Sequence, residues 1–380
     1  MDLKIPKIFK PSSDAMIVRI VIIATIFGFS AGVVGQMVSH VYIDPYLEPY
    51  TFVYNINTNV ADIPELRRIR SFSGTQQDIV VENLSQKIGL SLAGLYLKKS
   101  QTSDIAKNIY LEDDLLANCF VLTSDGWLTC QSSTIKNYGS KQLTVLLDKT
   151  THDIDEIVSD TLTNVSFIKI NAHNLTPVVL GDWKESTIGQ TVVVMNSVGQ
   201  STITNIENLN FKDDGKTAIR STEIFYKYIL LKDELANAYL GSAVVNLGGE
   251  VIGVLEKTKI GELQKVIPTN YFFSVILGVL RQGEIQRPGL GLKYIDLSDT
   301  NTTQQKNGAL IYQDPSRTSP AYQAELKIDD IIISVDGVPV DNKNTLTQLI
   351  QEYRIGDDIE LVVIREEQER VVEAFLGEAK

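Results

Sequence analysis

The first 40 residues carry one long uncharged apolar stretch. Ile20–Val38 is 19 residues without a charge, about the length that a helix needs to cross a bilayer core. Basic residues precede it and acidic residues follow it: Lys4, Lys7, Lys10, Arg19, Asp44 and Glu48. By the positive-inside rule, the pattern predicts a cytoplasmic tail over 1–14 and a single transmembrane anchor over 15–40. The rest of the chain would then lie outside the cytoplasm, at the cell membrane. The alternative is a cleaved signal peptide, whose apolar core would have to be unusually long.

Beyond the predicted anchor, residues 41–75 read as a linker and residues 76–284 as a β-rich domain. Short apolar runs recur between turn signals, as expected for a barrel or a sandwich. The runs are Leu90–Leu97, Cys119–Leu122, Trp127–Cys130, Leu143–Leu147, Val165–Ile170, Thr191–Met195, Ser201–Ile206, Ala243–Val245 and Val251–Leu255. Helical periodicity appears at Asn270–Arg281. The pattern therefore predicts an all-β domain that ends in a helix.

Composition excludes several classes of function. The net charge of −12 argues against a nucleic-acid partner, because phosphates are neutralised by clustered Lys and Arg. The chain has three His and two Cys, too few for a zinc site or a disulfide framework. We therefore expect neither a metal ion nor a cofactor.

One stretch carries a specific resemblance. Residues 236–255 read ANAYLGSAVVNLGGEVIGVL, a loop followed by two apolar runs and a tight turn at Asn246–Gly249. This resembles the nucleophile loop and hairpin of the HtrA/Deg family, trypsin-like serine proteases with a C-terminal PDZ domain. Further family-like segments lie in the same order along the chain: Cys119–Gly126, Phe167–Ile170, Leu180–Asp182 and Val266–Pro268. The resemblance implies a mostly β protein, with a trypsin-like double β-barrel over 76–284 and an α+β PDZ domain over 285–380.

The resemblance also places the catalytic triad, and the residues there differ from His, Asp and Ser. Ser133 (or Ser132, with a slip of one residue) stands at the His position, Asn164 at the Asp position and Leu240 at the Ser position. A serine protease needs a hydroxyl, a base and a carboxylate that orients the base. The resemblance therefore implies a protease homologue without activity. We expect Ser133, Asn164 and Leu240 to converge at the cleft between two six-stranded barrels.

Two other functions stay open. The chain could be an active endopeptidase of protein quality control with a relocated nucleophile, such as Ser242. The bases available to it are His40, His152, His173 and, as a dyad, Lys232. Alternatively, the chain could regulate an active paralogue in a mixed trimer. In the family, aromatic residues ahead of the protease domain hold trimers together, and Tyr46, Tyr50, Phe52 and Tyr54 occupy that segment here.

Cys119 and Cys130 lie symmetrically about the turn at Ser124-Asp125. In a hairpin this spacing puts both side chains on one face, within reach of a disulfide. The alternative is two small buried thiols, since cysteine is often buried.

The C-terminal segment resembles the PDZ domain of bacterial HtrA-type proteins. Its opening Gly-Leu-Gly-Leu includes Leu290, Gly291 and Leu292, which match the loop that binds a peptide's terminal carboxylate. On the following helix, Leu346 and Ile350 are expected in the core, and Thr345 and Leu349 facing the groove. The expected partners are peptides or unfolded proteins with free C-termini, unless the groove is unused or internally occupied.

Overall fold

The computed structural model describes residues 76–100, 108–213, 218–258, 264–299 and 307–379, and four single residues at positions 24, 25, 28 and 31. The chain divides into two compact units, Met1–Thr75 and Gln76–Lys380, and the elements below belong to the second. The predicted tail, anchor and linker lie outside the described residues, apart from those four positions. Within the described part, no helix combines the length and the apolar character needed to cross a membrane.

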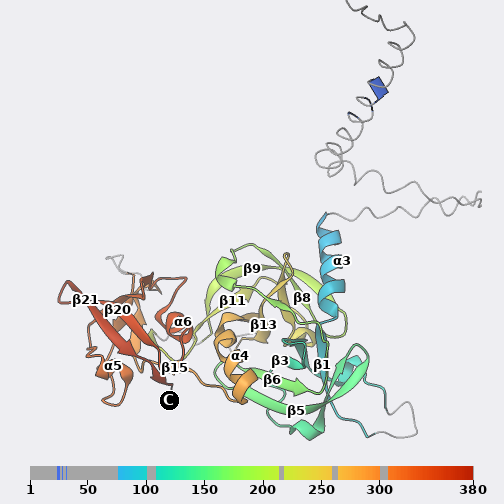
Figure 1. The fold of residues 1–380 in the computed structure, drawn as a ribbon, viewed down its shortest axis with the longest axis horizontal. Helices are drawn as coiled ribbons and strands as arrows, with labels where there is room; N and C mark the ends of the chain where they lie inside the picture. Colours follow the sequence, from blue (N-terminus) through green and yellow to red (C-terminus); the bar gives the residue numbers. More distant parts are fainter. Residues whose placement is uncertain are drawn as a thin grey trace, which may run out of the picture. The chain divides into compact units, whose positions relative to one another are not determined.

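The first barrel is closed and has six strands, in the order β1-β2-β3-β6-β5-β4 (Figure 1). The strands are β1 (Leu92–Leu97), β2 (Leu115–Val121), β3 (Trp127–Gln131), β4 (Leu143–Leu147), β5 (Thr150–Asp160) and β6 (Val165–Ile170). Because side chains alternate along a strand, β2 sends Cys119 and Val121 into the barrel interior and Phe120 to the opposite side. The predicted strands of this region are therefore present, with small shifts at their ends.

The second barrel forms from a sheet in the order β12-β8-β9-β11-β14-β13-β7, which an additional β12–β13 pairing closes. Its strands are β7 (Val179–Leu180), β8 (Thr191–Met195), β9 (Ser201–Lys212), β11 (Lys227–Leu231), β12 (Ala243–Asn246), β13 (Glu250–Lys257) and β14 (Gln264–Pro268). The β12–β13 hairpin turns at the predicted Asn246–Gly249, where Gly249 has a φ of +85° that favours glycine.

A shared apolar core joins the two barrels and two helices. Phe120 and Phe167 of the first barrel pack in one cluster with Val193 and Met195 of the second. The helices α3 (Gln76–Gly89) and α4 (Asn270–Gln282) add Leu84 and further buried side chains to it. The described part of the chain also contains five short 3₁₀ turns: Glu112–Asp114, Ser140–Gln142, Trp183–Glu185, Asn237–Tyr239 and Leu297–Asp299.

Cys119 and Cys130 are joined by a disulfide inside the first barrel. The two residues face each other directly across the β2–β3 ladder, with their Cα atoms 4.3 Å apart. That separation is typical of a non-hydrogen-bonded pair, in which cross-strand side chains come closest. The crosslink therefore fastens the hairpin that precedes the Ser133 position.

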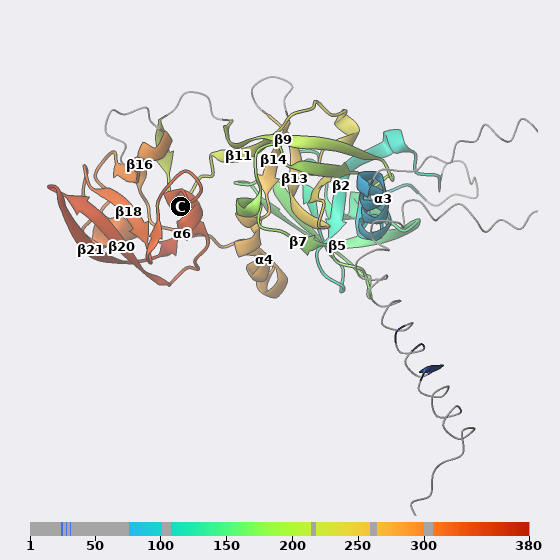
Figure 2. The same cartoon turned by 90° about the horizontal axis from the view of Figure 1, so that it is seen from above.

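The C-terminal domain is built on a sheet in the order β10-β16-β17-β18-β20-β21, with β19 paired to β18 (Figure 2). Its elements are β15 (Pro288–Gly289), β16 (Lys293–Asp296), β17 (Ala309–Ile311), α5 (Pro320–Gln323), β18 (Ile331–Val335), β19 (Val338–Pro339), α6 (Leu346–Gln351), β20 (Asp358–Arg365), β21 (Gln368–Phe375) and β22 (Gly377–Glu378). Strand β10 (Ile219–Ser221) precedes residue 285 in sequence, yet it forms the edge of this sheet.

Candidate functional site

The loop ahead of β12 holds the predicted nucleophile position in a tight turn. Asn237–Tyr239 form a 3₁₀ turn, and the backbone N–H of Leu240 donates to the carbonyl of Asn237 at 3.0 Å. An oxyanion hole needs free backbone N–H groups aimed at the developing negative charge. Here the N–H at the nucleophile position is already bonded within its own loop.

Asn118 of β2 fastens this loop to the first barrel. Its side chain is buried, and its Nδ2 donates to the carbonyl oxygens of Ala238 and Leu240, both at 2.8 Å. Its Oδ1 accepts from the backbone N–H and the hydroxyl of Ser197, at 2.9 and 2.8 Å. With both ends of the amide satisfied, Asn118 keeps the loop in its 3₁₀ conformation.

The predicted triad positions line two cavities. Ser133 and Asn164 line one of about 350 Å³, and the carbonyl of Asn164 accepts from the N–H of Ser132 at 2.8 Å. Leu240 lines another, of about 530 Å³, beside Thr134. Ser133 and Asn164 thus line one cavity together. Leu240 lines the other cavity beside Thr134, the residue that follows Ser133.

Charged side chains line the same cavity as Asn164. The Asn164 amide donates to the carboxylate of Glu256, whose other oxygen lies 3.1 Å from Lys265 Nζ. Lys265 Nζ also contacts Asp213 at 2.7 Å and lies 4.0 Å from the centre of the Tyr228 ring. Burial by itself lowers the pKa of Lys265, but the Glu256 and Asp213 carboxylates outweigh it and leave that pKa raised. Sequence reasoning missed this cluster, because its members are far apart in the sequence, from Asn164 to Lys265.

The alternative nucleophile Ser242 is fully buried, and its hydroxyl has no hydrogen-bond partner in the described part of the chain. Of its candidate bases, His152 lies on β5, His173 is exposed and Lys232 is exposed. His40 lies outside the described residues. An activated serine needs a base within hydrogen-bond reach, and the described residues supply none to Ser242.

The predicted carboxylate loop of the C-terminal domain contacts residues of the same chain. Gly291, at a φ of +75°, donates its N–H to the Glu223 carboxylate at 2.8 Å. Leu292 donates its N–H to the Thr222 hydroxyl at 3.1 Å, and its carbonyl accepts from Thr222 N–H at 3.1 Å. The carbonyl of Leu290 accepts from Ala321 N–H, which fixes the loop from behind.

The groove helix presents other residues than the predicted pair. Thr345 is the N-cap of α6 and accepts from Gln348 N–H, while Leu349 is buried in the domain core with Leu346 and Ile350. The contacts to the neighbouring segment 221–222 come instead from Thr347 and Gln351. Both were missed, although their i, i+4 spacing on a polar stripe was a usable signal.

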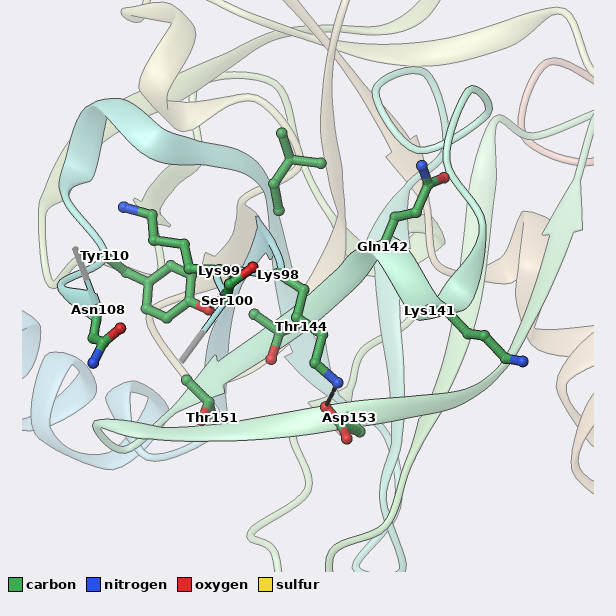
Figure 3. Close-up of a pocket in the computed structure, with 11 residues that line it drawn as sticks. Lys98, Lys99, Ser100, Asn108, Tyr110, Lys141, Gln142, Thr144, Thr151 and Asp153 are labelled. Atoms are coloured by element: carbon green, nitrogen blue, oxygen red, sulfur yellow. Dashed lines mark hydrogen bonds and ion pairs between the residues drawn. The ribbon is translucent and has the colours of Figure 1, made fainter. Parts of the chain in front are cut away.

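A separate cavity of about 950 Å³ opens beside β1, β4 and β5 (Figure 3). Lys98 and Lys99 line it, but Lys98 pairs with Asp153 and Lys99 with Asp114, each at 2.6 Å. None of the three triad positions lines this cavity.

Comparison with known proteins agrees with these two folds. A family model described as a PDZ domain matches residues 288–376. A probable periplasmic DegP-like serine endoprotease from Halomonas elongata is 28% identical over 69% of this chain and 56% of its own length. The Do-like serine protease HtrB of Bacillus subtilis is 27% identical over 63% of this chain and 57% of its own length. The serine endoprotease DegS of Haemophilus influenzae is 21% identical over 80% of this chain and 88% of its own length. The chain spans little more than half the length of the first two relatives.

Solved structures of the HtrA-type protease AlgW share the fold. The complex with a tripeptide superposes with a TM-score of 0.57 at 21% identity, covering 79% of this chain and 97% of that one. The complex with a decapeptide superposes with a TM-score of 0.53 at 18% identity, covering 79% of this chain and 98% of that one.

Proposed function

We propose that this chain has no proteolytic activity. It belongs to the HtrA/Deg family of trypsin-like serine proteases with a C-terminal PDZ domain. Its role would be to bind peptides or unfolded proteins through the PDZ domain. The proposal rests on the loop ahead of β12, where the family resemblance assigns the serine position to Leu240, and on the hydrogen bond from the Leu240 N–H to the Asn237 carbonyl. Loss of the triad alone reduces turnover by about 10⁶ in a serine protease.

The same proposal includes the location of the protein. The uncharged run Ile20–Val38 would anchor it in the cell membrane, with the barrels and the PDZ domain outside the cytoplasm. The Cys119–Cys130 disulfide supports that location, because disulfides persist in oxidising compartments.

A fluorophosphonate probe should leave the purified full-length protein unlabelled, and the protein should leave casein intact in zymography. The probe reacts only with a serine that a neighbouring base activates, and the hydroxyl of Ser242, the alternative nucleophile, has no hydrogen-bond partner in the described part of the chain. Trypsin serves as the positive control for the probe. Labelling that disappears in Ser242→Ala would reveal a relocated nucleophile and would refute the proposal.

A further inference from the structure

The groove of the PDZ domain is already filled by the chain itself. Strand β10 pairs antiparallel with β16, with Ile219 opposite Ile295, Arg220 opposite Tyr294 and Ser221 opposite Lys293. The segment runs toward the Gly-Leu-Gly-Leu loop, so its end reaches Gly291 and Leu292. An extended peptide bound by strand addition would take the same place along the sheet edge.

A carboxylate lies at the loop, and it comes from a side chain. Glu223 accepts the Gly291 N–H at 2.8 Å, and the hydroxyls of Ser221 and Thr222 also donate to it. Thr222 occupies the place of a last peptide residue, because its backbone N–H and its hydroxyl both bond to Leu292. Hydrogen bonds to a charged group are stronger than neutral ones, so Glu223 substitutes for a chain terminus at this point.

Contacts from α6 hold the segment in place. Thr347 donates its hydroxyl to the carbonyl of Ser221 at 2.7 Å, and Gln351 donates its amide to the carbonyl of Thr222 at 3.3 Å. Further along, Tyr226 is buried in the PDZ core, and its hydroxyl donates to Asp296 at 2.6 Å. Because the segment is covalently tied at both ends, it competes at a high effective concentration.

We propose that residues 219–223 are an intramolecular ligand of the PDZ groove, with Glu223 in the place of a terminal carboxylate. The groove then binds a separate peptide whose last residue is small and carries a free carboxylate. Thr222 fills the position of that last residue and is fully buried. Such a peptide binds only by displacing β10. This inference rests on the peptide-binding part of the proposed function.

The test uses the full-length protein and a fluorescein-labelled copy of residues 217–222, Thr-Ala-Ile-Arg-Ser-Thr, with a free or an amidated C-terminus. Glu223→Gln removes the charge at nearly constant shape. Glu234→Gln is the matched control, on an exposed loop residue. By fluorescence anisotropy, Glu223→Gln should bind the free-acid peptide at least about tenfold more tightly than the wild type, because a larger fraction of grooves is open. Glu234→Gln should match the wild type, and the amide should bind more weakly throughout.

Amide hydrogen exchange measures how strongly residues 219–223 protect the loop amides, without any added peptide. Exchange at Gly291 and Leu292 should speed up in Glu223→Gln and stay unchanged in Glu234→Gln. Unchanged exchange together with equal peptide affinity of wild type and Glu223→Gln would overturn the internal ligand and leave the peptide-binding function standing. Faster exchange with no peptide binding by any variant would uphold the internal ligand and overturn binding in trans. Equal binding of acid and amide would overturn the role of the carboxylate.

Discussion

Replacing Arg287 with methionine should lower the free energy of unfolding by about 3–5 kcal/mol. Arg287 is 3% exposed and forms an ion pair with Asp160, which is 2% exposed. Its guanidinium also donates to the carbonyl of Tyr271 at 2.9 Å and to the Gln351 amide oxygen at 3.2 Å. Loss of the cation leaves a buried carboxylate without its counter-charge. Urea unfolding, followed through the fluorescence of the buried Trp127 and Trp183, measures the effect.

Two further variants make that result specific. Arg281→Met removes an exposed arginine from the last turn of α4 and should change stability by less than about 0.5 kcal/mol. Adding Asp160→Leu to Arg287→Met removes both charges and should recover much of the loss. If Arg287→Met behaved like Arg281→Met, the buried pair would contribute no more than an exposed residue.

Placing an acid at Asn164, the predicted position of the triad Asp, should destabilise the protein. We expect Asn164→Asp to lower the free energy of unfolding by about 2–4 kcal/mol at neutral pH, since like charges about 4 Å apart repel by about 4 kcal/mol at an effective dielectric of about 20. The new carboxylate would replace an amide that donates to Glu256, and Lys265 would offset only part of the repulsion. The backbone is not the cause, because Asp tolerates the φ of +57° at this position much as Asn does.

Asn174→Asp is the matched control for this substitution. Asn174 has a φ of +58° and is exposed, so the change should stay within about 0.5 kcal/mol. Adding Glu256→Gln to Asn164→Asp should restore most of the stability. Repulsion raises the pKa of the carboxyl pair in the folded state, so the penalty is complete at neutral pH and shrinks as the pH falls through that raised pKa. A pH-independent loss would contradict the charge explanation.

The short apolar runs of the chain were sufficient to predict an all-β domain, whereas the double barrel was predicted from the family resemblance. Strands that lie between two apolar environments read as continuous apolar runs. On β8, Val192 and Val194 face the second barrel's interior while Val193 and Met195 face the core between the barrels. Sequence reasoning missed α3, although Val80, Leu84 and Ile88 follow one another at the i, i+4 spacing of a helix and pack against the core between the barrels. It also gave no sign that β10 pairs with β16, because a three-residue strand is defined by its distant partner more than by its own sequence.

A short motif was enough to single out the loop residues of the candidate site, whereas contacts that depend on packing were not visible in the sequence. The loop residues Leu290, Gly291 and Leu292 came from a short motif. Asn118 did not, because its partner Ala238 is 120 residues away. On α6, the predicted groove face assumed that Thr345 lies inside the helix. Thr345 is the cap, and the helix begins at Leu346, so Thr347 and Gln351 make the contacts.

The placement of β10 and Tyr226 has a consequence for how the chain folds. Both are encoded before residue 285, yet they complete the sheet edge and the core of the C-terminal domain. A fragment beginning at 285 would expose the backbone of β16 along an open edge, which invites pairing with other chains. During synthesis, the C-terminal domain would reach its full stability only against a second barrel that is already made. Residues 219–226 thus tie the second barrel to the sheet and core of the PDZ domain, across the predicted boundary at 284–285.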